Sequence, residues 1–240
     1  MRRREQSVCY LLILTWKRKR TIKVSKMAGK TEVIIIGGGA AGMTAAIACA
    51  RQMIQQYADQ KDGEGASGAA DLGKRITILE HNEKLGRKLS ATGNGKCNYT
   101  NRFQSMECYR GNDKEVIEQI LNQFGVEDTI AFFKGIGIYP KEKNGYFYPF
   151  SEQAASIIEA MRLELEHLKV KIKCKEHIVK VEKKEGEFLV STETYTYRAP
   201  KLILATGGLA ASKLGSDGSG YTFAKSLGLE VTKLYPALTG

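Results

Sequence analysis

Residues 31–42 read Thr-Glu-Val-Ile-Ile-Ile-Gly-Gly-Gly-Ala-Ala-Gly, a β-branched apolar run that passes directly into glycines. Such a run is typical of a buried parallel strand, and the small residues of Ala40–Arg51 predict a helix that packs closely on a sheet. Gly37, Gly39 and Gly42 have the G-x-G-x-x-G spacing, and they lie between that strand and that helix. In this context the spacing indicates a dinucleotide-binding turn.

Each glycine of the turn has its own expected task. Gly37 permits the tight turn, Gly39 lets the backbone approach a pyrophosphate, and Gly42 allows the helix to pack closely against the strand. The phosphates would lie at the positive end of the helix, which begins at Ala40 and Ala41. The alternative is a glycine turn that serves packing only.

Glu80 ends the second expected strand, Arg75–Glu80, where it would accept hydrogen bonds from the ribose hydroxyls of adenosine. The usual gap from the glycines to this acid is about 20 residues. Here Gly42 and Glu80 are 38 positions apart (80 − 42), so we expect an insertion, Gln55–Gly73, in a surface loop. An acid here disfavours a 2′-phosphate and hence NADP. A solvated glutamate at a strand end is the alternative.

The remaining pattern alternates between helices and short strands. Helices are expected over 113–124, 126–134 and 152–168, and strands over 170–174, 177–183, 187–192, 195–198 and 201–205. A glycine loop at 215–220 precedes a short helix that ends near Leu227. This order predicts a doubly wound, Rossmann-like α/β domain with a small antiparallel β insert, a meander at about 170–198.

Residues 83–101 form a loop rich in glycine and asparagine. Arg87 and Lys88 supply cations near a pyrophosphate. Hydrogen bonds to a planar polar ligand are expected from Thr92, Gly93, Asn94 and Gly95. Cys97 and Asn98 could then lie near an isoalloxazine ring. A long surface loop with incidental glycines is the alternative interpretation.

These segments, together with 144–154, 202–208 and 215–228, resemble a known family: the NAD(P)/FAD-dependent oxidoreductases that include aminoacetone oxidase-like and BaiN-like flavoproteins. The resemblance covers residues 32–240. It implies FAD contacts at Gly37, Gly39, Ala41, Gly42, Glu80, Lys88, Thr92, Gly93, Asn94, Gly95, Cys97, Asn98 and Asn101. It also implies that Ile178 meets the adenine through its backbone and that Ala205, Thr206 and Gly207 pass close to the dinucleotide.

The resemblance implies an FAD-dependent oxidoreductase, in which hydride passes between a small-molecule substrate or NAD(P)H and the flavin. No catalytic acid or base can be named from these residues. His81, His167 and His177 are scattered, so no metal site is expected. Cys97 as a catalytic nucleophile is a less favoured alternative to a flavin-neighbouring role. Family members are longer, so we expect a fragment: an FAD-binding domain over 30–228, then the start of a substrate-side domain at 229–240.

The net charge of +11 is concentrated in the leader, residues 1–29. Residues 1–26 hold nine Lys or Arg and one acid, a contribution of 9 − 1 = +8, so the rest is nearly balanced and no nucleic-acid partner is expected. The leader is a disordered tail, a membrane tether or translated sequence upstream of Met27, the interpretation that we favour. Its apolar run, Val8–Trp16, is too short for the ~20 residues of a membrane span.

Five cysteines without C-x-x-C spacing favour a reducing, cytoplasmic location. Two other functions compete with the expected oxidoreductase. The first is a tRNA-modifying flavoprotein that would use the basic leader on RNA. The second is a truncated, inactive FAD-binding module. The oligomeric state is left open.

Overall fold

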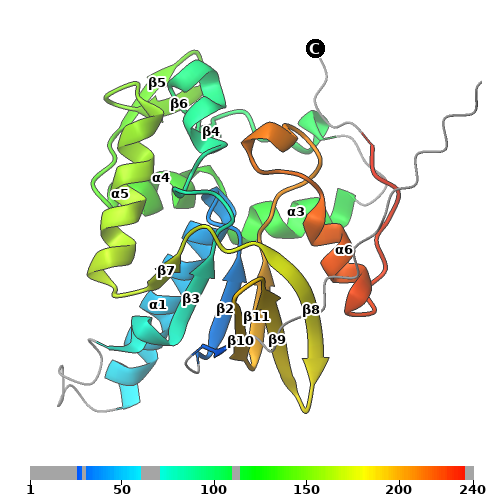
Figure 1. Cartoon of the computed structure of the whole chain (residues 1–240). Coiled ribbons are helices and arrows are strands. Elements are labelled where there is room, and N and C mark those ends of the chain that lie inside the picture. The colour runs from blue at the N-terminus through cyan, green and yellow to red at the C-terminus, as the bar shows by residue number, and fades with distance from the viewer. Residues whose placement is uncertain (1–25, 29–30, 61–70, 110–113, 236–240) are drawn as a thin grey trace, which may run out of the picture.

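A four-stranded parallel sheet forms the centre of the protein, as Figure 1 shows for the computed structural model. The strand order is β11 (Lys201–Leu204), β2 (Val33–Ile36), β3 (Ile76–Leu79) and β7 (Lys171–Lys173). All eight residues of β2 and β3 are buried, as expected for strands covered on both faces. The structure describes residues 26–28, 31–60, 71–109 and 114–235.

Helix α1 (Ala40–Gln60) connects β2 to β3 and packs beside α5 (Ala154–His167). Its buried side chains share one core with those of α5 and the sheet. The helix runs nine residues past its predicted end at Arg51 (60 − 51), because Met53 and Ile54 still pack against this core. The expected loop insertion is therefore partly helical, and residues 61–70 lie outside the described part.

A second sheet contains the expected antiparallel insert. Strands β8 (Ile178–Lys184), β9 (Glu187–Thr192) and β10 (Tyr195–Ala199) form a meander. The strand expected at 170–174 is not part of it: β7 pairs in parallel with β3 instead. The end of the expected leader is also structured, since β1 (Lys26–Met27) pairs in parallel with β10, whereas residues 1–25 lie outside the described part.

A third sheet was not expected from the sequence. Strands β4 (Thr100–Asn101), β6 (Tyr146–Pro149) and β5 (Pro140–Lys143) form an antiparallel sheet above α5 in Figure 1. Helices α3 (Lys114–Gln123) and α4 (Val126–Lys134) lie between β4 and β5 in the chain. Helix α6 (Ser219–Ser226) follows the parallel strand β11 and contacts β8. The carboxyl ends of β2, β3 and β11 thus face the loops that join these layers.

Candidate functional site

A cavity of about 310 Å³ lies at the carboxyl ends of β2, β3 and β11. This is where open α/β sheets bind their ligands, because the strand order reverses there and the loops diverge. Twelve of the predicted site residues line it: Gly37, Gly39, Ala40, Ala41, Glu80, Arg87, Lys88, Thr92, Ile178, Ala205, Thr206 and Gly207. The structure therefore gathers residues from four distant segments of the chain around one space.

The glycine turn closes tightly at two positions and is open at the third. Gly37 has φ +110°, and a Cβ there would lie 2.4 Å from the carbonyl oxygen of Ala205. A Cβ on Gly42 would lie 1.8 Å from the carbonyl oxygen of Gly37. At Gly39, which lines the cavity, a Cβ would have no neighbour within 4 Å. Gly37 and Gly42 are thus required by packing, whereas Gly39 leaves space beside the backbone for a ligand.

Glu80 follows β3 and is 5% exposed, and its carboxylate is held by protein donors. The backbone amide of Gly38 donates to Oε2 at 2.6 Å. The backbone amide and the side-chain amide of Asn82 both donate to Oε1 at 2.7 Å. A carboxylate oxygen accepts about two hydrogen bonds, so Oε2 has capacity for one more donor.

The two cations of the loop are also held by neighbouring groups. Arg87 donates from Nη1 to Oδ1 of Asn82 at 2.7 Å. Lys88 donates from Nζ to the carbonyl oxygen of Ala210 at 3.1 Å and to Oγ of Ser216 at 3.2 Å. Lys88 thereby connects the loop after β3 to the loop after β11, across the cavity that both line.

Seven predicted site residues do not line this cavity: Gly42, Gly93, Asn94, Gly95, Cys97, Asn98 and Asn101. Three of them form an exposed left-handed turn directly after Thr92, with φ of +55° at Gly93, +54° at Asn94 and +81° at Gly95. Asn101 lies on β4, where its Oδ1 accepts from the backbone amide of Phe103 at 2.9 Å. Gly42 lies on α1 beside the glycine turn, whereas the segment from Gly93 onward leads to β4 of the third sheet.

Cys97 is 1% exposed and packs within the main core. Burial raises the pKa of its thiol, because the charged thiolate loses solvation there. A thiol held neutral and out of solvent is a poor nucleophile, which argues against the catalytic alternative.

Sequence reasoning missed several polar residues of the cavity wall. His81 and His177 both line it, with ring centroids 6.1 Å apart. Glu176 lines it too, and its Oε1 accepts a hydrogen bond from the hydroxyl of Tyr197 at 2.7 Å. His177 is exposed and still lines the cavity. The available signal was position: His81 directly follows the second strand, and Glu176 and His177 directly precede β8.

Among the described residues, no group of three or more His, Cys, Asp or Glu could hold a metal ion. No helix of the described part is long and apolar enough to cross a membrane.

Comparison with known families indicates which ligand this cavity binds. Residues 64–236, which are more than half of the chain, match the HI0933-like protein Rossmann domain. The chain belongs to the HI0933-like family. Residues 32–87 also match an FAD binding domain, and that segment contains the glycine turn, Glu80 and Arg87. The cofactor of this family member is therefore FAD.

Curated relatives of this HI0933-like chain include a bile acid reductase and two ribosomal RNA dihydrouridine synthases. A 3-dehydro-bile acid delta(4,6)-reductase from Clostridium scindens is 40% identical over 85% of this chain and 46% of its own length. A ribosomal RNA dihydrouridine synthase from Haemophilus influenzae is 29% identical over 85% of this chain and 47% of its own length. The chain spans about half the length of these relatives. From the sequence we expected no nucleic-acid partner. The match to a ribosomal RNA dihydrouridine synthase leaves that expectation without support.

A solved structure shows the same fold at low identity. The open conformation of a flavocytochrome c3 fumarate reductase superposes with a TM-score of 0.53 and 14% identity, covering 83% of this chain and 40% of that one. The comparison agrees with the predicted Rossmann-like α/β architecture.

Proposed function

We propose that this chain is the FAD-binding portion of a flavoprotein reductase that saturates a carbon–carbon double bond conjugated with a carbonyl group. The observation that carries the proposal is the cavity at the carboxyl ends of β2, β3 and β11, where the open side of Gly39 and the held carboxylate of Glu80 face one space. Bound FAD would supply hydride transfer there. The protein's own residues bind and orient it.

Three parts of the wall have complementary roles in this proposal. Gly39, Ala40 and Ala41 line the cavity, so the amides at the start of α1 would bind the pyrophosphate, where the helix dipole is positive. Oε2 of Glu80 accepts from a ribose hydroxyl. The backbone of Ile178 meets the adenine.

The remaining contacts belong to the loops on either side. Arg87 and Lys88 lie near the phosphates, and the segment 205–207 passes beside the dinucleotide. The flavin ring end is expected along Thr92, Gly93, Asn94, Gly95, Cys97, Asn98 and Asn101. Residues 30–228 would form this FAD-binding domain.

The chemistry follows from what the two kinds of relative have in common. A delta(4,6)-reductase of a 3-dehydro-bile acid and a dihydrouridine synthase each saturate a ring double bond in conjugation with a carbonyl. Such a bond accepts hydride at its far carbon, because the charge that develops is delocalised onto oxygen. A small molecule with this group is our first candidate substrate, on the basis of the higher identity to the bile acid reductase. NAD(P)H is the proposed electron donor.

Flavin binding and reduction test this function. Purified protein should retain FAD, or quench its fluorescence on titration, and Glu80→Ala should weaken that binding. The reduced flavin should be reoxidised without oxygen by a 3-oxo steroid with a conjugated double bond and not by the saturated steroid. Bound flavin that dithionite bleaches, but that neither NAD(P)H reduces nor the steroid reoxidises, would favour the inactive-module alternative.

RNA is the second candidate substrate, because two ribosomal RNA dihydrouridine synthases match the chain. Reoxidation of the reduced flavin by uridine-containing RNA, with no response to the steroid, would favour it. We also propose a cytoplasmic location. The four cysteines of the described part are all free thiols, in agreement with a reducing compartment.

A further inference from the structure

One face of the β5–β6 hairpin carries aromatic and basic side chains only. Lys141 pairs directly with Tyr148, and Lys143 with Tyr146. Since directly paired residues of an antiparallel sheet project to the same side, these four side chains share one face. The pairing continues to Tyr139 and Phe150 at the end of the hairpin, where the amide of Phe150 donates to the carbonyl of Tyr139 at 2.8 Å. The hairpin face therefore consists of Tyr139, Lys141, Lys143, Tyr146, Tyr148 and Phe150.

Three of the four aromatic rings of the hairpin face are open to solvent, and Tyr148 is half-buried. Tyr139 is 66% exposed, Tyr146 44% and Phe150 73%. The opposite side of β6 behaves differently, because Phe147 and Pro149 are buried beneath the sheet. Packing within the chain thus accounts for the apolar side chains of Phe147 and Pro149, but it does not account for the aromatic rings that face outward. A cluster of exposed rings on a rigid sheet is typical of an interaction surface.

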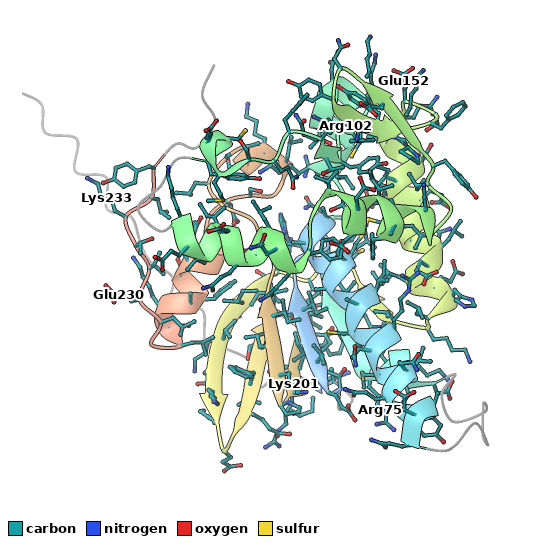
Figure 2. All side chains as sticks on the ribbon, turned by 180° about the vertical axis from the view of Figure 1, so that it is seen from behind. Arg75, Arg102, Glu152, Lys201, Glu230 and Lys233 are labelled. Carbon is teal, nitrogen blue, oxygen red and sulfur yellow. The ribbon has the colours of Figure 1, made fainter. Side chains whose placement is uncertain are left out.

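The charge on and beside this face is positive. Lys141 contacts Glu152 at 2.5 Å, and Lys96 contacts the same carboxylate at 3.7 Å. Lys143 makes no ion pair within the described part of the chain. These three lysines and one glutamate leave a local charge of 3 − 1 = +2. Figure 2 shows Glu152 at the outer end of the hairpin, away from the parallel sheet.

We propose that the hairpin face binds single-stranded RNA. Flat exposed rings offer stacking surfaces for unpaired bases, and the neighbouring lysines offer contacts to phosphates. Alternate side chains on a strand lie about 7 Å apart, so the exposed rings of Tyr146 and Phe150, four positions apart, can each take a base of their own. Duplex bases are stacked on one another and cannot use these rings. The choice of RNA over DNA rests on the proposed function, in which RNA is the second candidate substrate. The evidence for a stacking surface is independent of that proposal.

The test measures binding of a fluorescein-labelled 12-nucleotide polyuridine to the protein without added FAD, by fluorescence anisotropy. Tyr146→Ala and Phe150→Ala should each weaken binding about fivefold or more, as expected for the loss of one base–aromatic stack. Lys143→Ala should lower the salt dependence of the logarithm of affinity by about 0.7. Matched controls are Tyr195→Ala, an aromatic 38% exposed on β10, and Lys201→Ala on β11, both of which should bind like the unaltered protein.

Three results would overturn the proposal. The first is unchanged polyuridine binding by both aromatic variants, which would make any binding purely electrostatic. The second is equal affinity for duplex RNA or for oligothymidine of the same length. The third is a changed sedimentation coefficient of Tyr146→Ala with unchanged RNA affinity, which would identify a self-association surface. Because the assay contains no flavin, FAD binding without RNA binding refutes this proposal alone, and RNA binding without FAD binding refutes the proposed reductase alone.

Discussion

Asn82 donates two hydrogen bonds to one oxygen of Glu80, from its backbone amide and from its side-chain amide, both at 2.7 Å. Arg87 holds the other end of the Asn82 side chain through Oδ1. Oε1 of Glu80 is thereby saturated, and within the described part of the chain Oε2 accepts from the Gly38 amide alone. In the proposed site, Oε2 is left as the acceptor for a ribose hydroxyl of FAD.

Asn82→Ala should therefore weaken FAD binding without unfolding the protein. Losing one hydrogen bond that orients the Glu80 carboxylate costs about 1 kcal/mol, which is roughly fivefold in Kd. Quenching of FAD fluorescence on titration measures the change. Asn122→Ala, at an exposed position of α3, is the control. Equal Kd values for the two variants would contradict an orienting role of Asn82.

Gly39→Ala and Gly42→Ala should separate ligand binding from folding. The Cβ added at Gly39 meets no atom, so the free energy of unfolding should be nearly unchanged while FAD affinity falls. The Cβ added at Gly42 would lie 1.8 Å from the Gly37 carbonyl oxygen, so that variant should be strongly destabilised. Urea denaturation and FAD titration measure the two effects. Full FAD affinity in Gly39→Ala would place the pyrophosphate elsewhere.

The protein should lose stability in alkaline solution. Burial raises the pKa of the Cys97 thiol above 9.0 and that of the Tyr99 hydroxyl to about 12. A group whose pKa is higher in the folded than in the unfolded protein favours the folded state as long as it stays protonated. Its contribution to stability is complete below the pKa of the unfolded state and is lost as pH rises through the pKa of the folded state. Unfolding free energy from urea melts should thus be level up to about pH 9, the ordinary thiol value, and fall between pH 9 and 12.

Tyr99→Phe provides the control for this pH dependence. The Tyr99 hydroxyl is buried and has no hydrogen-bond partner among the described residues. Its removal should leave stability at pH 7 unchanged or higher, and it should flatten the decline above pH 10. A steeper decline in the variant would show that the hydroxyl is ionised or paired in the folded protein.

Lys88→Ala should loosen the loop that follows β11. The Lys88 ammonium donates hydrogen bonds to the carbonyl oxygen of Ala210 and to Oγ of Ser216, and the substitution removes both of them. We expect faster proteolysis between residues 208 and 218, and weaker FAD binding since a cation near the phosphates is lost. Lys88→Arg should restore the charge. Cleavage rates equal to those of the unaltered protein would mean that the loop holds its position without Lys88.

Local patterns were sufficient for the strand–turn–helix unit. The apolar run of 31–36, the glycine spacing and Glu80 predicted a parallel sheet and a nucleotide turn, because strand burial and a tight turn each impose their own residue types. The end of α1 was predicted too early at Arg51, since Met53 and Ile54 lie among polar residues in the sequence and yet pack against the core that α1 shares with α5.

The partners of each strand and the convergence of the cavity wall were decided by tertiary structure. Strand β7 reads like part of the meander, yet it pairs with β3, because pairing depends on which edge is open rather than on the strand's own residues. His81 and His177 meet across 96 positions of the chain (177 − 81). The amino-acid sequence by itself determined the glycine turn and the acid that the proposed FAD site needs. Only the register of the β5–β6 hairpin placed its rings and lysines on one face, because register depends on pairing between strands.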